Sequence, residues 1–143
     1  MGQYHTLVNF DKHEIVNPHV IGNGLKMLEQ IGWKYASANA MALLLAGACK
    51  GGSRGGGDFK SGENHSIVGS WAGDRVAWVG DYSERSDYPS LTDEEYTILM
   101  TDSKLENPVF YKDVSEQIKL AMEEEFKIRY IGADGWVDIE ENK

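Results

Sequence analysis

A glycine-rich segment near the middle of the chain is the first place where residue types and spacing could serve chemistry. It reads Gly51-Gly52-Ser53-Arg54-Gly55-Gly56-Gly57-Asp58, and such a run lets consecutive backbone N–H groups point at one anion. It lacks the Gly-Lys-Ser/Thr ending of a nucleotide-binding P-loop, and a predicted helix precedes it instead of a strand. We expect a solvated loop over 50–66; the alternative is a loop that orders around a ligand or partner through Arg54 and Lys60.

Three aspartates, Asp58, Asp74 and Asp81, each follow a glycine in this part of the chain. If their turns converged, the carboxylates could hold a hard cation such as Mg²⁺. Aspartate after glycine is also typical of ordinary turns. The spacing demands no metal, and no Cys/His set fits a structural zinc site. We therefore expect turns, without a metal or a cofactor.

Histidine is the side chain that titrates nearest neutral pH, and the chain has four histidines. A hairpin register with Asp11-Lys12 as the loop places His5 and His13 on opposite faces, which argues against a shared metal. His65, which follows the glycine-rich loop, is the better candidate for proton transfer. The candidate catalytic residues are thus Asp58, His65, Asp74 and Asp81, although no Ser-His-Asp or Cys-His arrangement supports them.

Aromatic side chains are frequent, with four tryptophans and seven tyrosines, but the net charge is −9. A stacking platform for nucleic-acid bases needs a basic groove around it. The negative charge also opposes binding to generic nucleic acid or to an anionic membrane. We expect core and interface packing, with Trp71 and Trp78 as candidate partner contacts.

A length of 143 residues suggests one domain over 1–143. Periodicity predicts a buried central helix over 38–49, capped by Ser37, and an amphipathic helix over 114–125. A short helix is expected after Asn23, its candidate cap, ending at Gly32, with Leu25, Leu28 and Ile31 as its apolar side. Residues 96–100 suit a helix or a strand, although Thr92 and Glu95 have the spacing of a capping box.

Strands are predicted in three hairpins, over 4–16, 67–79 and 127–139, with a further short strand over 109–111. The fold class is α+β, a single compact domain with a mostly antiparallel sheet, a buried central helix and a C-terminal amphipathic helix. Outside these elements we expect the glycine-rich loop over 50–66 and a frayed acidic tail over 140–143.

One cysteine, Cys49, excludes an intrachain disulfide framework and suits a reducing compartment. No secretory signal opens the sequence, and its longest apolar run is about half of the roughly 20 residues that a membrane crossing needs. We expect a cytoplasmic location and no membrane partner.

Several short motifs carry a resemblance over roughly residues 1–82. They include Met1-Gly2-Gln3-Tyr4, Val8-Asn9, Asp11-Lys12, Pro18-His19, Arg54-Gly55-Gly56-Gly57-Asp58 and Trp71-Ala72-Gly73-Asp74-Arg75. In these the chain resembles an uncharacterised family of small proteins carried by phages, plasmids and bacterial or archaeal genomes. The resemblance implies a mobile-element context, in which small acidic proteins often bind host components, and it brings no activity with it.

The leading hypothesis is a non-enzymatic binding protein that engages a host factor or a small phosphate-bearing ligand, in the host cytoplasm if it is phage-encoded. The expected contacts are Arg54, Asp58, Lys60, Trp71 and Trp78. One alternative is a small hydrolase or transferase acting on a nucleotide-like substrate; another is a structural accessory protein. Homo-oligomerisation stays open. A deep pocket lined by ionisable groups would favour the enzyme, and an exposed apolar patch the binder.

Overall fold

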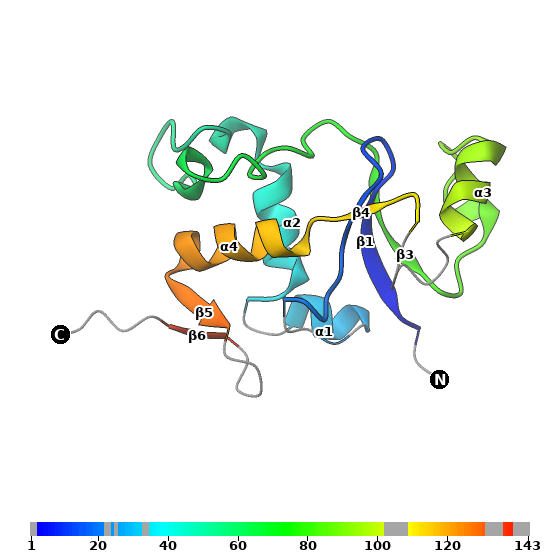
Figure 1. Ribbon diagram of the computed structural model, residues 1–143, viewed down its shortest axis with the longest axis horizontal. Coiled ribbons are helices and arrows are strands. Elements are labelled where there is room, and N and C mark those ends of the chain that lie inside the picture. Colours follow the sequence, from blue (N-terminus) through cyan, green and yellow to red (C-terminus); the bar gives the residue numbers. More distant parts are fainter. Residues whose placement is uncertain are drawn as a thin grey trace.

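Two adjacent apolar residues in the first strand, which point to opposite faces of the sheet, decide the architecture. Strand β1 (His5–Asn9) buries Leu7 on one face and Val8 on the other. A strand with two buried faces belongs in the interior of a sheet that is covered on both sides. It pairs antiparallel with β2 (Glu14–Val16) and with β3 (Val76–Gly80) (Figure 1). The computed structural model describes residues 3–21, 24, 26–32, 35–101, 109–130 and 136–138.

The sheet has the order β3-β1-β2-β4, and β4 (Lys112–Asp113) runs parallel to β2. Pairing of Leu7 with Val16 and of Val8 with Ile15 is the register that a turn at 11–12 requires, so the predicted first hairpin is confirmed. The strand predicted over 109–111 is wrong, because these residues form bends and the ladder starts at Lys112.

Buried Asn9 fixes the turn of this hairpin. Its side-chain oxygen accepts the backbone N–H groups of Asp11 and Lys12 at 2.9 and 2.8 Å, and its amide group donates to Asp74 at 2.8 Å. These bonds satisfy a polar side chain that is completely buried.

Helices cover the two faces of the sheet separately (Figure 1). On one face lie α1 (Met27–Gly32), α2 (Ser37–Leu45) and α4 (Ser115–Phe126). The core on this side includes Leu7, Val16, Ile21, Leu43, Leu44, Trp71, Ile118 and Met122. Helix α3 (Asp93–Thr101) and the segment 85–91, which begins with a 3-10 turn (Arg85–Asp87), lie on the other face. The second core includes Val8, Phe10, Ile15, Val79, Tyr88, Leu91, Leu99 and Tyr111.

The predicted central helix is present but shorter than expected. Helix α2 ends at Leu45, and a 3-10 turn (Gly47–Cys49) follows. The backbone carbonyl groups of Leu43 and Leu44 in α2 accept the N–H groups of Gly69 and Trp71, at 2.8 and 3.0 Å. The helix therefore ends where a segment distant in sequence takes over its last acceptors.

The same two bonds overturn the hairpin predicted over 67–79. Residues 66–74 form consecutive turns beside α2, and only Val76–Gly80 is a strand. The indole of Trp71 is completely buried, and its Nε1 donates to Glu14 at 2.6 Å. Tertiary contacts thus replace the ladder that alternation predicted.

Capping decides the segment that the sequence pattern left open. The Thr92 hydroxyl accepts the Glu95 N–H at 3.1 Å, and the Glu95 carboxylate accepts the Thr92 N–H at 2.9 Å. This capping box begins α3, so residues 96–100 are helical.

The C-terminal elements also match their predictions. Helix α4 has the amphipathic character predicted over 114–125, because its inward stripe of Ile118, Ala121 and Met122 is buried. Strand β5 (Ile128–Tyr130) pairs antiparallel with β6 (Trp136–Asp138). The chain is thus an α+β domain with a mostly antiparallel sheet, and the predicted tail at 140–143 lies outside the described residues.

Because Leu44 is completely buried in the last turn of α2, Leu44→Ala should lower the free energy of unfolding by about 2–5 kcal/mol through lost burial and a residual cavity. Chemical denaturation measures the loss. The control is Ala42→Ser on the exposed side of the same helix, which should change stability by less than about 0.5 kcal/mol. Equal effects of the two substitutions would show that α2 is not central.

Candidate functional site

The glycine-rich loop is anchored at its base by the C-terminal end of α4. One carboxylate oxygen of Glu125 accepts the N–H groups of Lys60 and Ser61, at 2.5 and 2.7 Å. Glu124 bonds to the side chains of Asn64 and His65, both at 3.0 Å. The sequence carried a signal for this contact, because Glu125 occupies the last position of the inward stripe of α4.

Packing orders the base of this loop further, whereas its tip is exposed. A Cβ atom on Gly62 would lie 2.2 Å from the backbone oxygen of Cys49, so only glycine fits there. At the tip, residues 53–57 are exposed, and the Asp58 carboxylate accepts the Arg54 N–H at 2.9 Å. Ordering of the base therefore requires no ligand.

The four candidate catalytic residues lie in separate hydrogen-bonding environments. Asp58 is at the loop tip, and His65 pairs with Glu124 on α4. Asp74 accepts Lys12 Nζ at 2.5 Å just before β3, whereas Asp81 accepts the Tyr4 N–H at 3.1 Å just after it. The structure does not bring these groups together. Among the residues that it describes, no cluster of three His, Cys, Asp or Glu side chains could hold a metal.

The predicted binding residues differ in how accessible their side chains are. Arg54 and Lys60 lie on the exposed part of the loop, and their role in binding stays a prediction. The proposed contact through Trp71 is wrong in this structure, because that side chain has no exposed surface. Trp78 is half-buried, and its Nε1 donates to Gln30 at 3.2 Å.

An ion-pair network that the sequence did not reveal surrounds Arg75. Its guanidinium group donates to Asp11 at 2.8 Å, to the backbone oxygen of Ser90 at 2.8 Å and to Glu95 at 2.7 Å. The network ties the β1–β2 turn to the start of α3. The Arg75 side chain lowers the pKa of Glu95 to about 2, and the Arg75 N–H is the main cause of the lowered pKa of Asp11.

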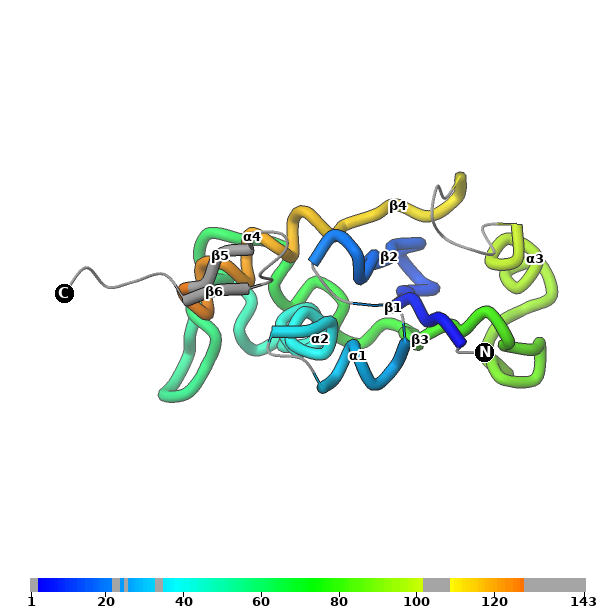
Figure 2. Tube along the Cα trace, turned by 90° about the horizontal axis from the view of Figure 1, so that it is seen from below, coloured from blue at the N-terminus to red at the C-terminus, as the bar shows by residue number. Residues whose placement is uncertain are grey.

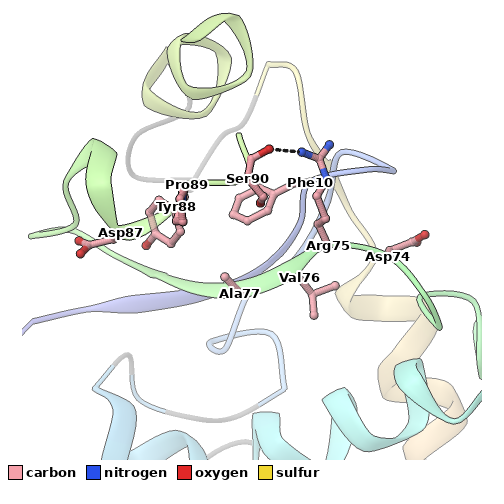
Figure 3. A pocket seen from close by; sticks show the side chains of 9 residues that line it. All are labelled: Phe10, Asp74, Arg75, Val76, Ala77, Asp87, Tyr88, Pro89 and Ser90. Carbon is pink, nitrogen blue, oxygen red and sulfur yellow. Dashed lines mark hydrogen bonds between the residues drawn. The ribbon is translucent and has the colours of Figure 1, made fainter. Parts of the chain in front are cut away.

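A pocket of about 370 Å³ lies between β3 and the segment that carries Tyr88 and Pro89 (Figure 3). Phe10 and Ala77 also line it, and the rings of Phe10 and Tyr88 meet edge to face at 5.7 Å. Arg75 borders the pocket, but its donors are already bound to acceptors of the protein. The pocket therefore offers mainly apolar surface.

Helix α1 exposes the side chains that its periodicity assigned to the core. Leu28 is 78% exposed and Ile31 is 53% exposed, so the predicted inward orientation is wrong; Leu25 lies outside the described residues. Gln30 is completely buried instead, and it donates to the His5 backbone oxygen at 2.9 Å. Because Gln30 also accepts the Trp78 indole, polar contacts with the sheet set the orientation of the helix.

Two exposed tyrosines lie at the end of the sheet that meets the start of α1. Tyr4, 49% exposed, pairs through its backbone with Lys26 immediately before α1. Asp81 bonds to Tyr4 through its N–H, which places Tyr82, 59% exposed, at the same end of the sheet. We call Tyr4, Leu28, Ile31 and Tyr82 the α1 surface.

Comparison with known proteins gives this surface no precedent. No family model, curated protein or solved structure matches the chain. In the part of the chain that the structure describes, the helices are too short or too polar to cross a membrane. The functional assignment therefore rests on the residues and their geometry.

The lowered pKa of Glu95 predicts how stability depends on pH. Because the pKa falls from 4.5 to about 2 on folding, the stabilising contribution is full above the higher value and is lost as the pH drops toward the lower one. In Glu95→Gln the free energy of unfolding should therefore decline less steeply than in the wild type between pH 4.5 and 2. Denaturation at a series of pH values measures both slopes.

The control for this experiment is Glu94→Gln. Glu94 precedes Glu95 in the sequence, and its side chain is exposed. The control variant should follow the wild-type curve. A Glu95→Gln curve that runs parallel to the wild type throughout the acid range would contradict the role of the Arg75 network.

Proposed function

We propose that the protein acts without catalysis, by binding another protein through the α1 surface. The observation that carries the proposal is the orientation of α1, which exposes Leu28 and Ile31 while it buries Gln30. A soluble chain gains about 25 cal/mol for each Å² of apolar surface that it removes from water. This helix forgoes that gain within its own fold, which supports burial against a partner.

The distribution of ionisable groups also supports binding over catalysis. General acid–base catalysis needs at least one titratable group within reach of substrate, commonly together with a second group that orients or activates it. Asp58, His65, Asp74 and Asp81 are instead bonded to four different parts of the fold. The alternative of a small hydrolase or transferase therefore lacks a site in which these residues cooperate.

The net charge of the chain and its resemblance to proteins of mobile elements narrow the class of partner. The net charge of −9 favours a protein with a basic rim around its contact area. The resemblance to small proteins of phages and plasmids suggests that this partner is a host factor, encountered in the cytoplasm. Contacts from Arg54 at the loop tip and from Lys60 near its base would add a second, polar area to the apolar one.

Site-specific photo-crosslinking in the cells of origin tests this function. A photoreactive residue placed at Leu28 should capture one protein, because 78% of this side chain faces solvent. The matched position is Leu120 on α4, which is also an exposed leucine, at 53%, but lies outside the α1 surface. It should not capture the same protein.

The captured protein, once purified, should bind the wild type and the Leu120→Asp variant equally well. Leu28→Asp should weaken its binding at least about tenfold, or about 1.4 kcal/mol. Capture of the same proteins at both positions, or equal affinity of the two variants, would overturn the assignment.

A further inference from the structure

We infer that the partner binds as an additional β-strand along the outer edge of β3, with one of its side chains in the pocket beside that edge. This inference rests on the proposed binding function and states how the partner is held. In such complexes backbone hydrogen bonds supply affinity, and pockets for alternate side chains supply specificity.

The hydrogen-bond alternation of β3 identifies the groups on its outer edge. Phe10 donates its N–H to the Arg75 backbone oxygen at 2.9 Å, and Asp81 donates to the Tyr4 backbone oxygen at 3.0 Å. In an antiparallel ladder this assigns every second residue of β3 to bonds with β1. Val76, Trp78 and Gly80 therefore direct their N–H and C=O groups away from β1.

One of these three residues is already engaged. Gly80 donates its N–H to the Ser83 hydroxyl at 3.0 Å. For Val76 and Trp78, the described residues supply no hydrogen-bond partner to the outward backbone groups. Both are only partly buried. Within the described part of the chain, Val76 and Trp78 thus leave two backbone N–H donors and two backbone C=O acceptors free on the outer side of β3, and these groups form an open edge.

The pocket lies next to this edge. Val76 and Ala77 of β3 line it together with Tyr88 and Pro89 (Figure 3). Because side chains alternate along a strand, a residue added opposite Ala77 would direct its side chain to the pocket face of the sheet. The volume of 370 Å³ is at the lower end of the roughly 300–1,000 Å³ range of small-molecule pockets, so one large apolar side chain suits it.

The charges around the pocket specify the residue next to that apolar side chain. Asp87 lies at the pocket with an exposed side chain, whereas Arg75 is bonded to Asp11 and Glu95. A basic side chain therefore complements the mouth of the pocket, as it does the net charge of −9. The occupant is an extended segment of a different protein that combines an apolar and a basic side chain.

A second copy of the chain fits this edge less well. Self-pairing that uses both Val76 and Trp78 would place Ala77 opposite Ala77, and a methyl group would leave the pocket empty. Two copies would also bring together two net charges of −9.

The edge and the α1 surface can serve one partner. Gln30 of α1 accepts the indole N–H of Trp78, and Figure 2 shows α1 beside β3. A protein that adds a strand to β3 would thus lie next to Leu28 and Ile31.

Amide hydrogen exchange followed by NMR tests the edge in the protein alone. The amides of Val76 and Trp78 should exchange quickly, whereas those of Ala77 and Val79 should be protected by β1. Protection of all four amides would overturn the inference. Protection of Val76 and Trp78 that grows with protein concentration would identify a second copy as the occupant and overturn it as well.

Selection from a displayed library of extended peptides, each about ten residues long, tests the occupant. Peptides that pair a large apolar with a basic side chain should be enriched, and the best of them should be synthesised. Val76→Pro removes one outward N–H without removing a bond to β1, and edge strands tolerate proline there. It should weaken binding of that peptide at least about tenfold.

Val76→Thr is the matched control, because it keeps the N–H group and the branched shape, and it should bind the peptide like the wild type. Strand addition would be overturned if the library shows no enrichment of such peptides. It would also be overturned if Val76→Pro binds the selected peptide as well as the wild type does, or if both variants lose the same affinity for it. If Leu28 still crosslinks a partner in that case, the binding function stands without this mode; if it does not, the function itself is wrong.

Discussion

The burial of β1 on both faces is the constraint on which the rest of the structure depends. Leu7 and Val8 are adjacent in sequence, yet they belong to two different cores. The chain must therefore build one helical layer for each face, with α2 and α4 on one side and α3 with the segment 85–91 on the other. With β1 in the interior, β3 becomes an edge strand. The proposed binding mode follows from that position, because the outward hydrogen-bonding groups of β3 are a consequence of the sheet order.

The excess of carboxylates serves this architecture. Glu125 holds the base of the glycine-rich loop, Glu95 caps α3 and pairs with Arg75, and Asp74 joins Asn9 and Lys12 at the hairpin turn. Each accepts a hydrogen bond from a turn, a loop or the residue that precedes a helix. Asp74 is a candidate catalytic residue in the sequence, as are Asp58 and Asp81, and in the structure all three carboxylates accept hydrogen bonds that hold turns and strand ends together.

Sequence patterns predicted those features whose causes are local. The hairpin register follows from the turn at 11–12, and the Thr92–Glu95 capping box decides the helical state of α3. The outward orientation of Leu28 could not be predicted, because it depends on bonds from Gln30 to β1 and β3. Nor could the turns over 66–74, which depend on carbonyl groups of α2. Periodicity reports the preferences of one segment and carries no information on such distant partners.

Mass measurement of the intact protein under native conditions, after purification from the cells in which it occurs, tests the central claim most directly. The claim is that the protein works by holding another protein and not by transforming a small molecule. The account predicts the mass of the chain alone together with that of a complex containing one different polypeptide. A retained nucleotide or metal ion, with no second polypeptide, would contradict it.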